Sequence, residues 1–392
     1  MTVAVSDMKL KQQPEDFQVE ELTDVAPGKD GPFAFYRLEK TAWSTPDAIQ
    51  AIRRRWHLHP RRISYGGLKD RHAQTVQYLT IHRGPTHELT HHNVHVRYLG
   101  QVTEAYTSRH IRANRFRITL REVAPEKIAA ARRALEEIGA AGLPNYFDDQ
   151  RFGSVGTEQE FVARLMILGR YEEALRLALT GPYEYDRAPQ KREKAILLAH
   201  WGDWRTAKAK LPRSPVDHLL SHPTDFRGAL ARLQPELRGL YLWAYQSYLW
   251  NKMLARWLER LCRPEQLVRV PLRLGEVPMQ RALDDGQQKT MAETVLPLPS
   301  ARLKIDAQHP QAALINAVMA EEGFALQEMK IKKMHEPFFS KGDRPALCLP
   351  EQLHYETAAD EMHAGFQKLV MSFDLPRGSY ATLLVKRVQA AQ

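Results

Sequence analysis

The chain of 392 residues has only two cysteines, Cys262 and Cys348. Two thiols cannot build a disulfide framework, and they exclude a cysteine-rich metal site. The sequence has no run of about twenty apolar residues, so a membrane-spanning helix is not expected. Its first residues also lack the basic stretch followed by an apolar run that marks a secretory signal. We therefore expect a cytoplasmic protein that does not associate with a membrane.

Positive charge is abundant instead. The formal net charge is +10 and the sequence pI is about 9.5. Such an excess can serve solubility alone, or it can bind the phosphates of a nucleic acid. Arginines concentrate in residues 53–71 and 97–121, where aromatic residues lie between them. This mixture favours RNA, since guanidinium groups bind phosphates and aromatic rings stack on unpaired bases.

Hydrophobic patterns divide the chain into three stretches. Strands are expected at 17–25, 33–40, 75–83, 94–101 and 115–121, and helices at 45–56 and 125–139. From 157 to 322 leucine, alanine and arginine recur at helical spacing, and strand patterns nearly disappear until about residue 366. Two last strands are expected at 368–375 and 380–388, completing the first sheet. The patterns predict an α+β fold with a mostly helical insertion.

A short internal repeat lies within that insertion. Residues 169–174 (Gly-Arg-Tyr-Glu-Glu-Ala) recur in similar form as residues 202–207 (Gly-Asp-Trp-Arg-Thr-Ala). A turn followed by a helix at this period is typical of tetratricopeptide repeats, but such arrays need three or more copies. We expect a local pair of helical hairpins, suited to contact RNA or a partner.

His87, Glu88 and His91 match the H-E-x-x-H pattern of zinc hydrolases. On a helix this spacing places two imidazoles on one face, with the glutamate as general base. Here the motif lies in a short connection between two expected strands, directly after Gly84 and Pro85. A polar surface loop is the better interpretation, and zinc hydrolysis remains an alternative.

Asp70 stands out among the polar residues because Lys69, Arg71 and His72 surround it, after the glycine pair at 66–67. Nearby cations keep a carboxylate ionised, and an ionised carboxylate on a turn can act as nucleophile or base. An aspartate beside glycine can equally cap backbone N–H groups in a turn. The residues alone do not decide between these roles.

Four stretches together resemble the tRNA pseudouridine synthase D (TruD) family. Residues 11–17 (Lys-Gln-Gln-Pro-Glu-Asp-Phe) are similar to its K-x-x-P-E-D-F motif, and residues 67–77 to its G-x-K-D-[RK]-x-A-x-T-x-Q motif around Asp70. Residues 144–153 match P-N-Y-F-x-x-Q-R-F-G, and residues 375–382 resemble L-P-x-G-S-[FY]-A-T. Between 156 and 335 only residues 247–251 look similar to the family. Ala113 also stands where the family usually has a glycine.

The resemblance implies a pseudouridine synthase catalytic domain, an α+β domain with a mixed sheet and a central cleft. This domain would comprise 1–155 and 336–392, and a mostly helical inserted domain would comprise 156–335. It implies an isomerase that converts uridine to pseudouridine in tRNA, usually at position 13. No cofactor or metal is expected, and we expect a monomer.

The resemblance also implies roles for particular residues. Asp70 would be the catalytic carboxylate and Lys11 its ionic partner. The base would leave its stack and lie against Phe147. The remaining substrate-binding residues would be Asn145 at the uracil or the catalytic loop, Phe17 and Glu20 at the pocket floor, and Arg71, Gln150, Arg151 and the basic residues of 109–115 along the RNA.

Two other functions remain open from the sequence. A non-catalytic RNA-binding or chaperone protein on the same fold would explain the charge and the aromatic residues, but it would need neither Asp70 nor Lys11. A zinc hydrolase would use His87, Glu88 and His91, and it would contain stoichiometric zinc.

Overall fold

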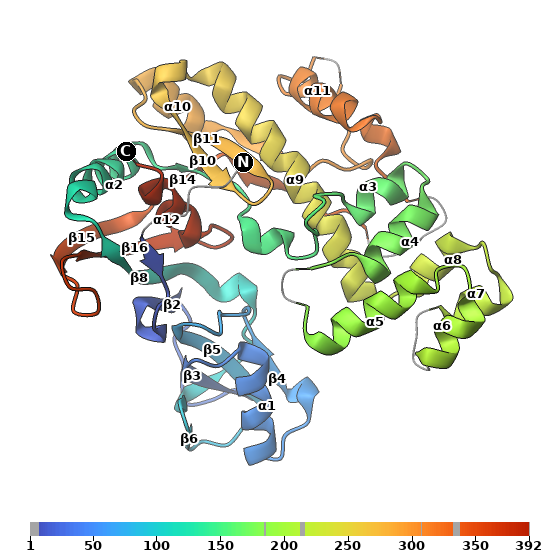
Figure 1. The fold of residues 1–392 in the computed structure, drawn as a ribbon. Coiled ribbons are helices and arrows are strands. Elements are labelled where there is room, and N and C mark those ends of the chain that lie inside the picture. The colour runs from blue at the N-terminus through green and yellow to red at the C-terminus, as the bar shows by residue number, and fades with distance from the viewer. Residues whose placement is uncertain (1–7, 184–185, 212–215, 307, 332–337, 392) are drawn as a thin grey trace. The chain divides into compact units, whose positions relative to one another are not determined.

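The computed structural model describes residues 8–183, 186–211, 216–306, 308–331 and 338–391. The chain divides into unit 1, made of 1–143 and 348–392, and unit 2, made of 144–347 (Figure 1). The chain leaves unit 1 at β9 (Leu143–Pro144) and returns at β14 (Leu347–Cys348). The expected boundary after residue 335 lies outside the described residues. The other, after 155, differs from the observed one, and residues 144–155 belong to unit 2. No helix in the described ranges is long and apolar enough to cross a membrane.

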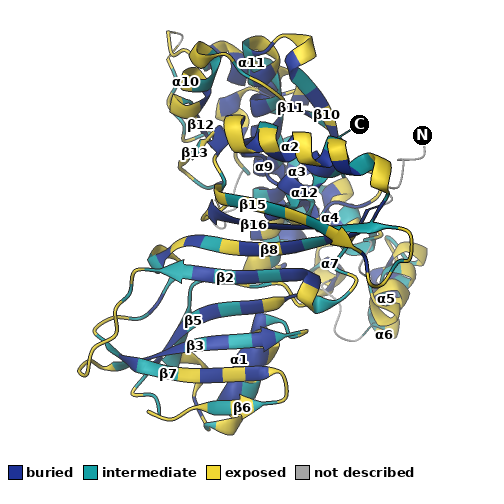
Figure 2. Cartoon of the chain, turned by 90° about the vertical axis from the view of Figure 1, so that its left-hand side faces the viewer, coloured by how far each residue is buried: buried dark blue, intermediate teal, exposed yellow. Residues whose placement is uncertain are grey.

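The described part of unit 1 contains one sheet of ten strands, with the order β15-β16-β8-β2-β5-β3-β7-β6 (Figure 2). The strands of this path are β2 (Phe17–Thr23), β3 (Phe33–Thr41), β5 (Gln74–His82), β6 (Leu89–His91), β7 (Val94–Val102), β8 (Ile111–Val123), β15 (Glu351–Ala359) and β16 (Gln367–Pro376). Short β1 (Lys9–Leu10) pairs with β8, and β4 (Ile63–Tyr65) pairs with β5. Strands β2 and β5 run parallel and their neighbours antiparallel, so the sheet is mixed. The expected α+β fold is confirmed.

Helix α1 (Thr45–Arg55) covers one face of β3, β5 and β7. It begins where the Ser44 hydroxyl accepts a hydrogen bond from the Asp47 N–H at 3.2 Å, and Pro46 lies in its first turn. Its apolar residues Ala48, Ile49 and Ile52 pack against alternate residues of the three strands. This packing leaves the opposite face of α1 in solvent.

Helices α2 (Ile128–Ala141) and α12 (Ala381–Gln389) complete unit 1. The strand expected at 380–388 is wrong, because these residues form α12. Ala381, Leu384, Val385 and Val388 are all buried, and their spacing puts them on one face of a helix. A strand was expected here because valine is common in strands. That preference is weak, and packing against the rest of the unit overrides it. The strand expected at 368–375 is confirmed as β16.

Unit 2 begins with short helices that share one apolar core. They are α3 (Val162–Ile167), α4 (Tyr171–Thr180), α5 (Ala188–Ala199), α6 (Trp204–Lys210), α7 (Asp217–Ser221) and α8 (Phe226–Ala231). Gly169 and Gly202, the first residues of the repeat, have positive φ angles of 77° and 92°. Each ends a turn just before α4 or α6, so the repeat corresponds to two helical hairpins.

The rest of unit 2 surrounds α9 (Pro235–Leu261), a helix of 27 residues. The other elements are β10 (Leu267–Leu272), β11 (Gly275–Gln280), α10 (Asp285–Glu293), β12 (Val295–Pro297), α11 (Ala312–Glu322) and β13 (Asp343–Pro345). The expectation that strands nearly vanish before residue 366 is therefore wrong. The β10–β11 hairpin is short, and β15 is a largely exposed edge strand with few apolar residues, so neither shows a strong strand pattern.

Candidate active site

Asp70 lies in the loop that joins β4 to β5. Gly66 begins this loop under tight packing, since a Cβ atom there would lie 2.6 Å from Cδ1 of Ile111. The backbone N–H of Lys69 donates to the Thr45 hydroxyl at 2.9 Å, and that hydroxyl donates to the Gln77 side chain at 2.8 Å. The glycine therefore allows close packing, and the loop is fixed to α1 and β5.

The Lys69 side chain turns inward from the same loop. Its Nζ atom lies 2.7 Å from a carboxylate oxygen of Glu21, a fully buried residue of β2, and it donates to the Asn114 amide oxygen at 2.9 Å. The other Glu21 oxygen accepts from the Tyr78 N–H at 3.1 Å. A buried carboxylate needs such partners, and here they attach the loop to three strands of the sheet.

Lys40 supports the Asp70 loop through hydrogen bonds to its backbone, a role that the sequence analysis missed. It lies near the end of β3, and its side chain is only 1% exposed. The ammonium group donates to the backbone carbonyl oxygens of Trp43 at 2.6 Å and Asp70 at 3.0 Å. Burial lowers the pKa of Lys40 to about 8, against the raising effect of the Asp70 charge. Lys40 thus holds the backbone of Asp70 and loses its proton more readily than an exposed lysine does.

Lys11 forms an ion pair with the Asp70 carboxylate, as the resemblance implied. The Lys11 Nζ atom also lies 4.1 Å from the centre of the Phe17 ring, a favourable place for a cation. Lys11 has a positive φ of 58°, a conformation that costs a non-glycine residue about 1–2 kcal/mol. The surrounding contacts hold it there, so the pairing geometry is built into the fold.

The Asp70 carboxyl is arranged to stay ionised. Partial burial alone raises its pKa, but the hydrogen bond and charge of Lys11 and the backbone N–H groups of His72 and Arg71 outweigh burial. The net result is a pKa below the usual aspartate value. With 40% of its side chain exposed, the carboxylate remains accessible to a substrate.

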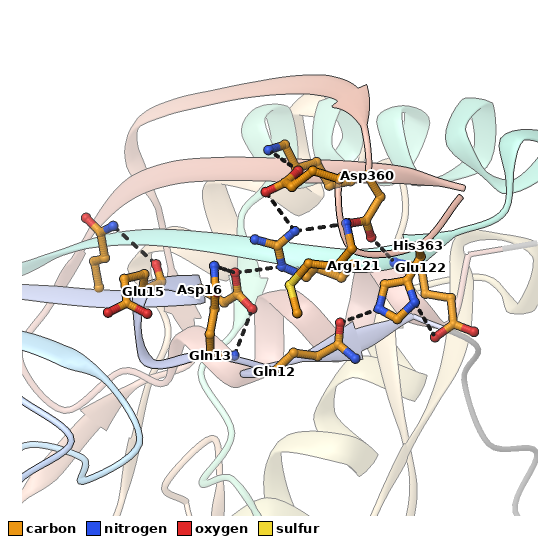
Figure 3. A network of polar contacts seen from close by, with 12 residues as sticks. Gln12, Gln13, Glu15, Asp16, Arg121, Glu122, Asp360 and His363 are labelled. Carbon is orange, nitrogen blue, oxygen red and sulfur yellow. Dashed lines mark hydrogen bonds and ion pairs between the residues drawn. The ribbon is translucent and has the colours of Figure 1, made fainter. Parts of the chain in front are cut away.

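A buried charge network holds the segment that carries Lys11 (Figure 3). Arg121 of β8 is 3% exposed, and its guanidinium contacts Asp16 at 2.8 Å and Asp360 at 3.0 Å. Directly after Lys11, the Gln12 side chain lies 2.6 Å from Nε2 of His363. The turn between β15 and β16 therefore anchors the segment that directly follows Lys11, and sequence patterns gave no sign of it.

The other predicted residues of unit 1 take different places. Arg71 is exposed beside Asp70. Glu20 lies on the face of β2 opposite to Phe17, because side chains alternate along a strand. There it is 3.8 Å from Arg37. The structure thus brings Lys11, Phe17 and Asp70 together and does not bring Glu20 into contact with them.

The predicted residues of unit 2 form a separate cluster against α9. The backbone of Phe147 exchanges two hydrogen bonds of 2.8 Å with the Asn251 side chain, and its ring packs edge-on against Trp250. The guanidinium of Arg344 lies 4.2 Å from the centre of the Phe147 ring and donates to the Asn145 side chain at 2.7 Å. Two of the family-like residues 247–251, Trp250 and Asn251, therefore hold Phe147.

Two further predicted residues flank this cluster. Arg151 donates to the Ser247 hydroxyl of α9 at 3.1 Å, and its guanidinium lies 5.5 Å from the centre of the Phe147 ring. Gln150 is exposed. Arg344, which the sequence analysis missed, links Asn145 to Phe147 and so organises this part of unit 2.

The H-E-x-x-H motif does not lie on a helix. His91 belongs to strand β6, which pairs with β7, and Nδ1 of His91 lies 3.0 Å from the Arg55 guanidinium. Without a helix, the H-E-x-x-H spacing does not bring the two imidazoles next to each other on one face. Within the described residues, no group of three or more metal-ligating side chains could hold an ion.

Comparison with known proteins gives a consistent result. The family model described as tRNA pseudouridine synthase D (TruD) matches residues 2–388. A Methanocaldococcus jannaschii protein named "Probable tRNA pseudouridine synthase D 2" is 30% identical, over 97% of this chain and 91% of its own. The Aquifex aeolicus protein named "tRNA pseudouridine synthase D" is 26% identical, over 97% of this chain and 98% of its own. A crystal structure of a Methanosarcina mazei protein described as TruD superposes with a TM-score of 0.74 at 26% identity, covering 98% of this chain and 94% of its own. The chain therefore belongs to the TruD family of tRNA pseudouridine synthases.

Proposed function

We propose that Asp70 is the catalytic carboxylate of this tRNA pseudouridine synthase and that Lys11 is its ionic partner. The observation that carries the proposal is the Lys11–Asp70 pair in an accessible loop, with the pKa of Asp70 lowered. Pseudouridine formation breaks the N1–C1′ bond, turns the uracil and joins C1′ to C5. The hydrogen of C5 is then lost, and N1 acquires a proton. The reaction is an isomerisation and needs no redox partner.

Three routes use the carboxylate differently. Asp70 can attack C1′, abstract the 2′ hydrogen to give a glycal, or attack C6 of the base. Each route requires an ionised Asp70 beside the nucleotide, and Lys11 favours that state. Lys11 acts as a point charge, because an ammonium group lacks the planar fork of arginine.

For unit 2 we propose that Phe147 stacks on the flipped uracil of uridine 13. Asn145, Gln150 and Arg151 contribute to substrate binding, together with Phe17, Glu20 and Arg71 of unit 1. The support for Phe147 is that Asn251 fixes its backbone and Trp250 packs against its ring. The Arg344 and Arg151 guanidinium groups lie 4.2 Å and 5.5 Å from the ring centre. Phe147→Tyr should retain activity and Phe147→Leu should lower kcat/KM, since stacking needs the ring.

A double-mutant cycle tests the proposed pair. Single-turnover rates are measured for Asp70→Asn, Lys11→Met and the double variant. If the two residues act as one unit, the double variant is no slower than Asp70→Asn. Additive losses would contradict the pairing. If the Asp70→Ala variant performs the biological role of the wild type, the protein would instead be a non-catalytic RNA-binding protein.

A further inference from the structure

A cavity of about 610 Å³ lies beside the Asp70 loop in unit 1. Its volume falls within the range of about 300–1,000 Å³ that is typical of small-ligand sites. The side chains that give it chemical character are Trp43, Asp47, Arg54, Arg55, Arg71 and His91. Arg71 directly follows Asp70 in the chain, so the cavity lies against the loop that carries the proposed catalytic residue.

Positive charge dominates this cavity. Among the described residues, Arg54, Arg55 and Arg71 have no ion pair with a carboxylate, and Arg54 and Arg55 lie on the exposed face of α1. Asp47 is the acid of the lining, and it accepts a hydrogen bond from the Ser44 hydroxyl at 2.6 Å as part of the helix cap. Three guanidinium groups without an acidic partner favour an anionic ligand.

The aromatic part of the cavity is tied to the catalytic loop. The Trp43 ring is partly buried and lies edge-on to His91 at 6.0 Å between ring centres. Its backbone carbonyl accepts from Lys40, and the same ammonium group holds the carbonyl of Asp70. The next backbone link, from the Ala42 N–H to the Ala73 carbonyl at 3.3 Å, joins the same two loops. Trp43 therefore keeps a fixed position relative to Asp70.

We propose that this cavity binds a nucleotide that flanks the target uridine in the RNA. The base would lie against Trp43, and its phosphates would contact Arg54, Arg55 and Arg71. Unpaired RNA nucleotides are recognised by this combination of an aromatic surface and guanidinium groups. The proposal rests on the proposed function for the identity of the substrate, and it assigns a specific place to the RNA next to the catalytic carboxylate.

The test compares two double variants with the same change in charge. Arg54→Gln/Arg55→Gln alters the cavity, and Arg132→Gln/Arg133→Gln alters two neighbouring exposed arginines of α2 as the control. Unmodified tRNA binding is measured by filter binding across a series of salt concentrations, without turnover. Tritium release from tRNA labelled at C5 of uracil then gives kcat and KM.

The cavity variant should bind tRNA on the order of ten-fold more weakly than the control at low salt. Its slope of log Kd against log salt should fall by about 1 to 2, because each lost phosphate contact removes about 0.7 to 0.9. KM should rise more than kcat falls. Trp43→Leu should weaken binding, and Trp43→Phe should restore it, since either aromatic ring can stack on a base.

Equal affinity and equal salt slope in the two double variants would overturn the cavity proposal, even if tritium release is normal. The proposed function fails separately, if the wild type binds tRNA but releases no tritium. In that case a weaker cavity variant would still support an RNA site here.

Discussion

Lys40 offers a perturbation whose effects on stability and activity should separate. Lys40→Met preserves an unbranched side chain of similar length and removes the charge. The pKa of Lys40 falls from 10.5 to about 8, so holding the protonated lysine in the folded protein costs about 3 kcal/mol at neutral pH. The substitution removes that cost. It also deprives two backbone carbonyls, those of Trp43 and Asp70, of their donor, at about 1–3 kcal/mol each.

These opposing contributions largely cancel, so the free energy of unfolding should change by no more than about 3 kcal/mol. Activity should not be spared. Without the ammonium group, the Asp70 backbone loses its support, and displacement of a catalytic group by about 1 Å can cost about 100-fold in rate. We expect kcat to fall by about 10- to 100-fold, with a smaller change in KM.

The assay pairs urea unfolding with tritium release, and Lys29→Met, an exposed lysine in the turn between β2 and β3, serves as the control for charge. Between pH 8 and 10.5 the unfolded chain holds the Lys40 proton more tightly than the folded one does. Raising the pH therefore favours the folded wild type relative to Lys40→Met, by up to about 3 kcal/mol. Wild-type kcat in Lys40→Met, or a difference in stability that does not change over this pH range, would refute the reasoning.

The remaining predictions concern Lys11 and the Arg121 network. Lys11→Met should lower kcat and move the acid limb of the pH–rate profile to higher pH, because burial then acts on Asp70 without its main cation; an unmoved limb would contradict the role of Lys11. Arg121→Leu should destabilise the protein by about 3–5 kcal/mol at pH 7 in urea unfolding, because it leaves Asp16 and Asp360 buried without a cation. The deficit should shrink as the pH falls and the Asp360 carboxyl becomes protonated, and a loss below about 1 kcal/mol at pH 7 would contradict the assigned importance of the network.

Most of the sheet in unit 1 could be predicted because its strands alternate clearly and its helix α1 has a clear cap and a proline at its start. The wrong predictions of secondary structure arose where the hydrophobic pattern of a segment did not decide between helix and strand. Residues 381–389 contain valine and leucine in an order that suits either element, and burial against unit 1 decides for the helix. Strand β15 pairs only along one edge and exposes most of its side chains, so it lacks an apolar pattern.

The candidate site was predictable only in part. The resemblance pointed to Lys11, Asp70 and Phe17, which the structure brings together. Lys40 and Arg121 could not be found this way, because charged residues within strands are usually exposed. Their burial follows from tertiary packing, with α1 over β3 for Lys40 and the turn after β15 over β8 for Arg121. The alternation of apolar and polar residues along a strand does not reveal which of its charged side chains another element will cover.

The proposed mechanism depends above all on Asp70 as the catalytic carboxylate in the isomerisation of uridine. Its most direct test is tritium release from tRNA labelled at C5 of uracil, with the wild type and Asp70→Asn measured side by side. We expect release by the wild type and none by Asp70→Asn, with tRNA affinity unchanged within about three-fold. Release by Asp70→Asn at the wild-type rate would contradict it.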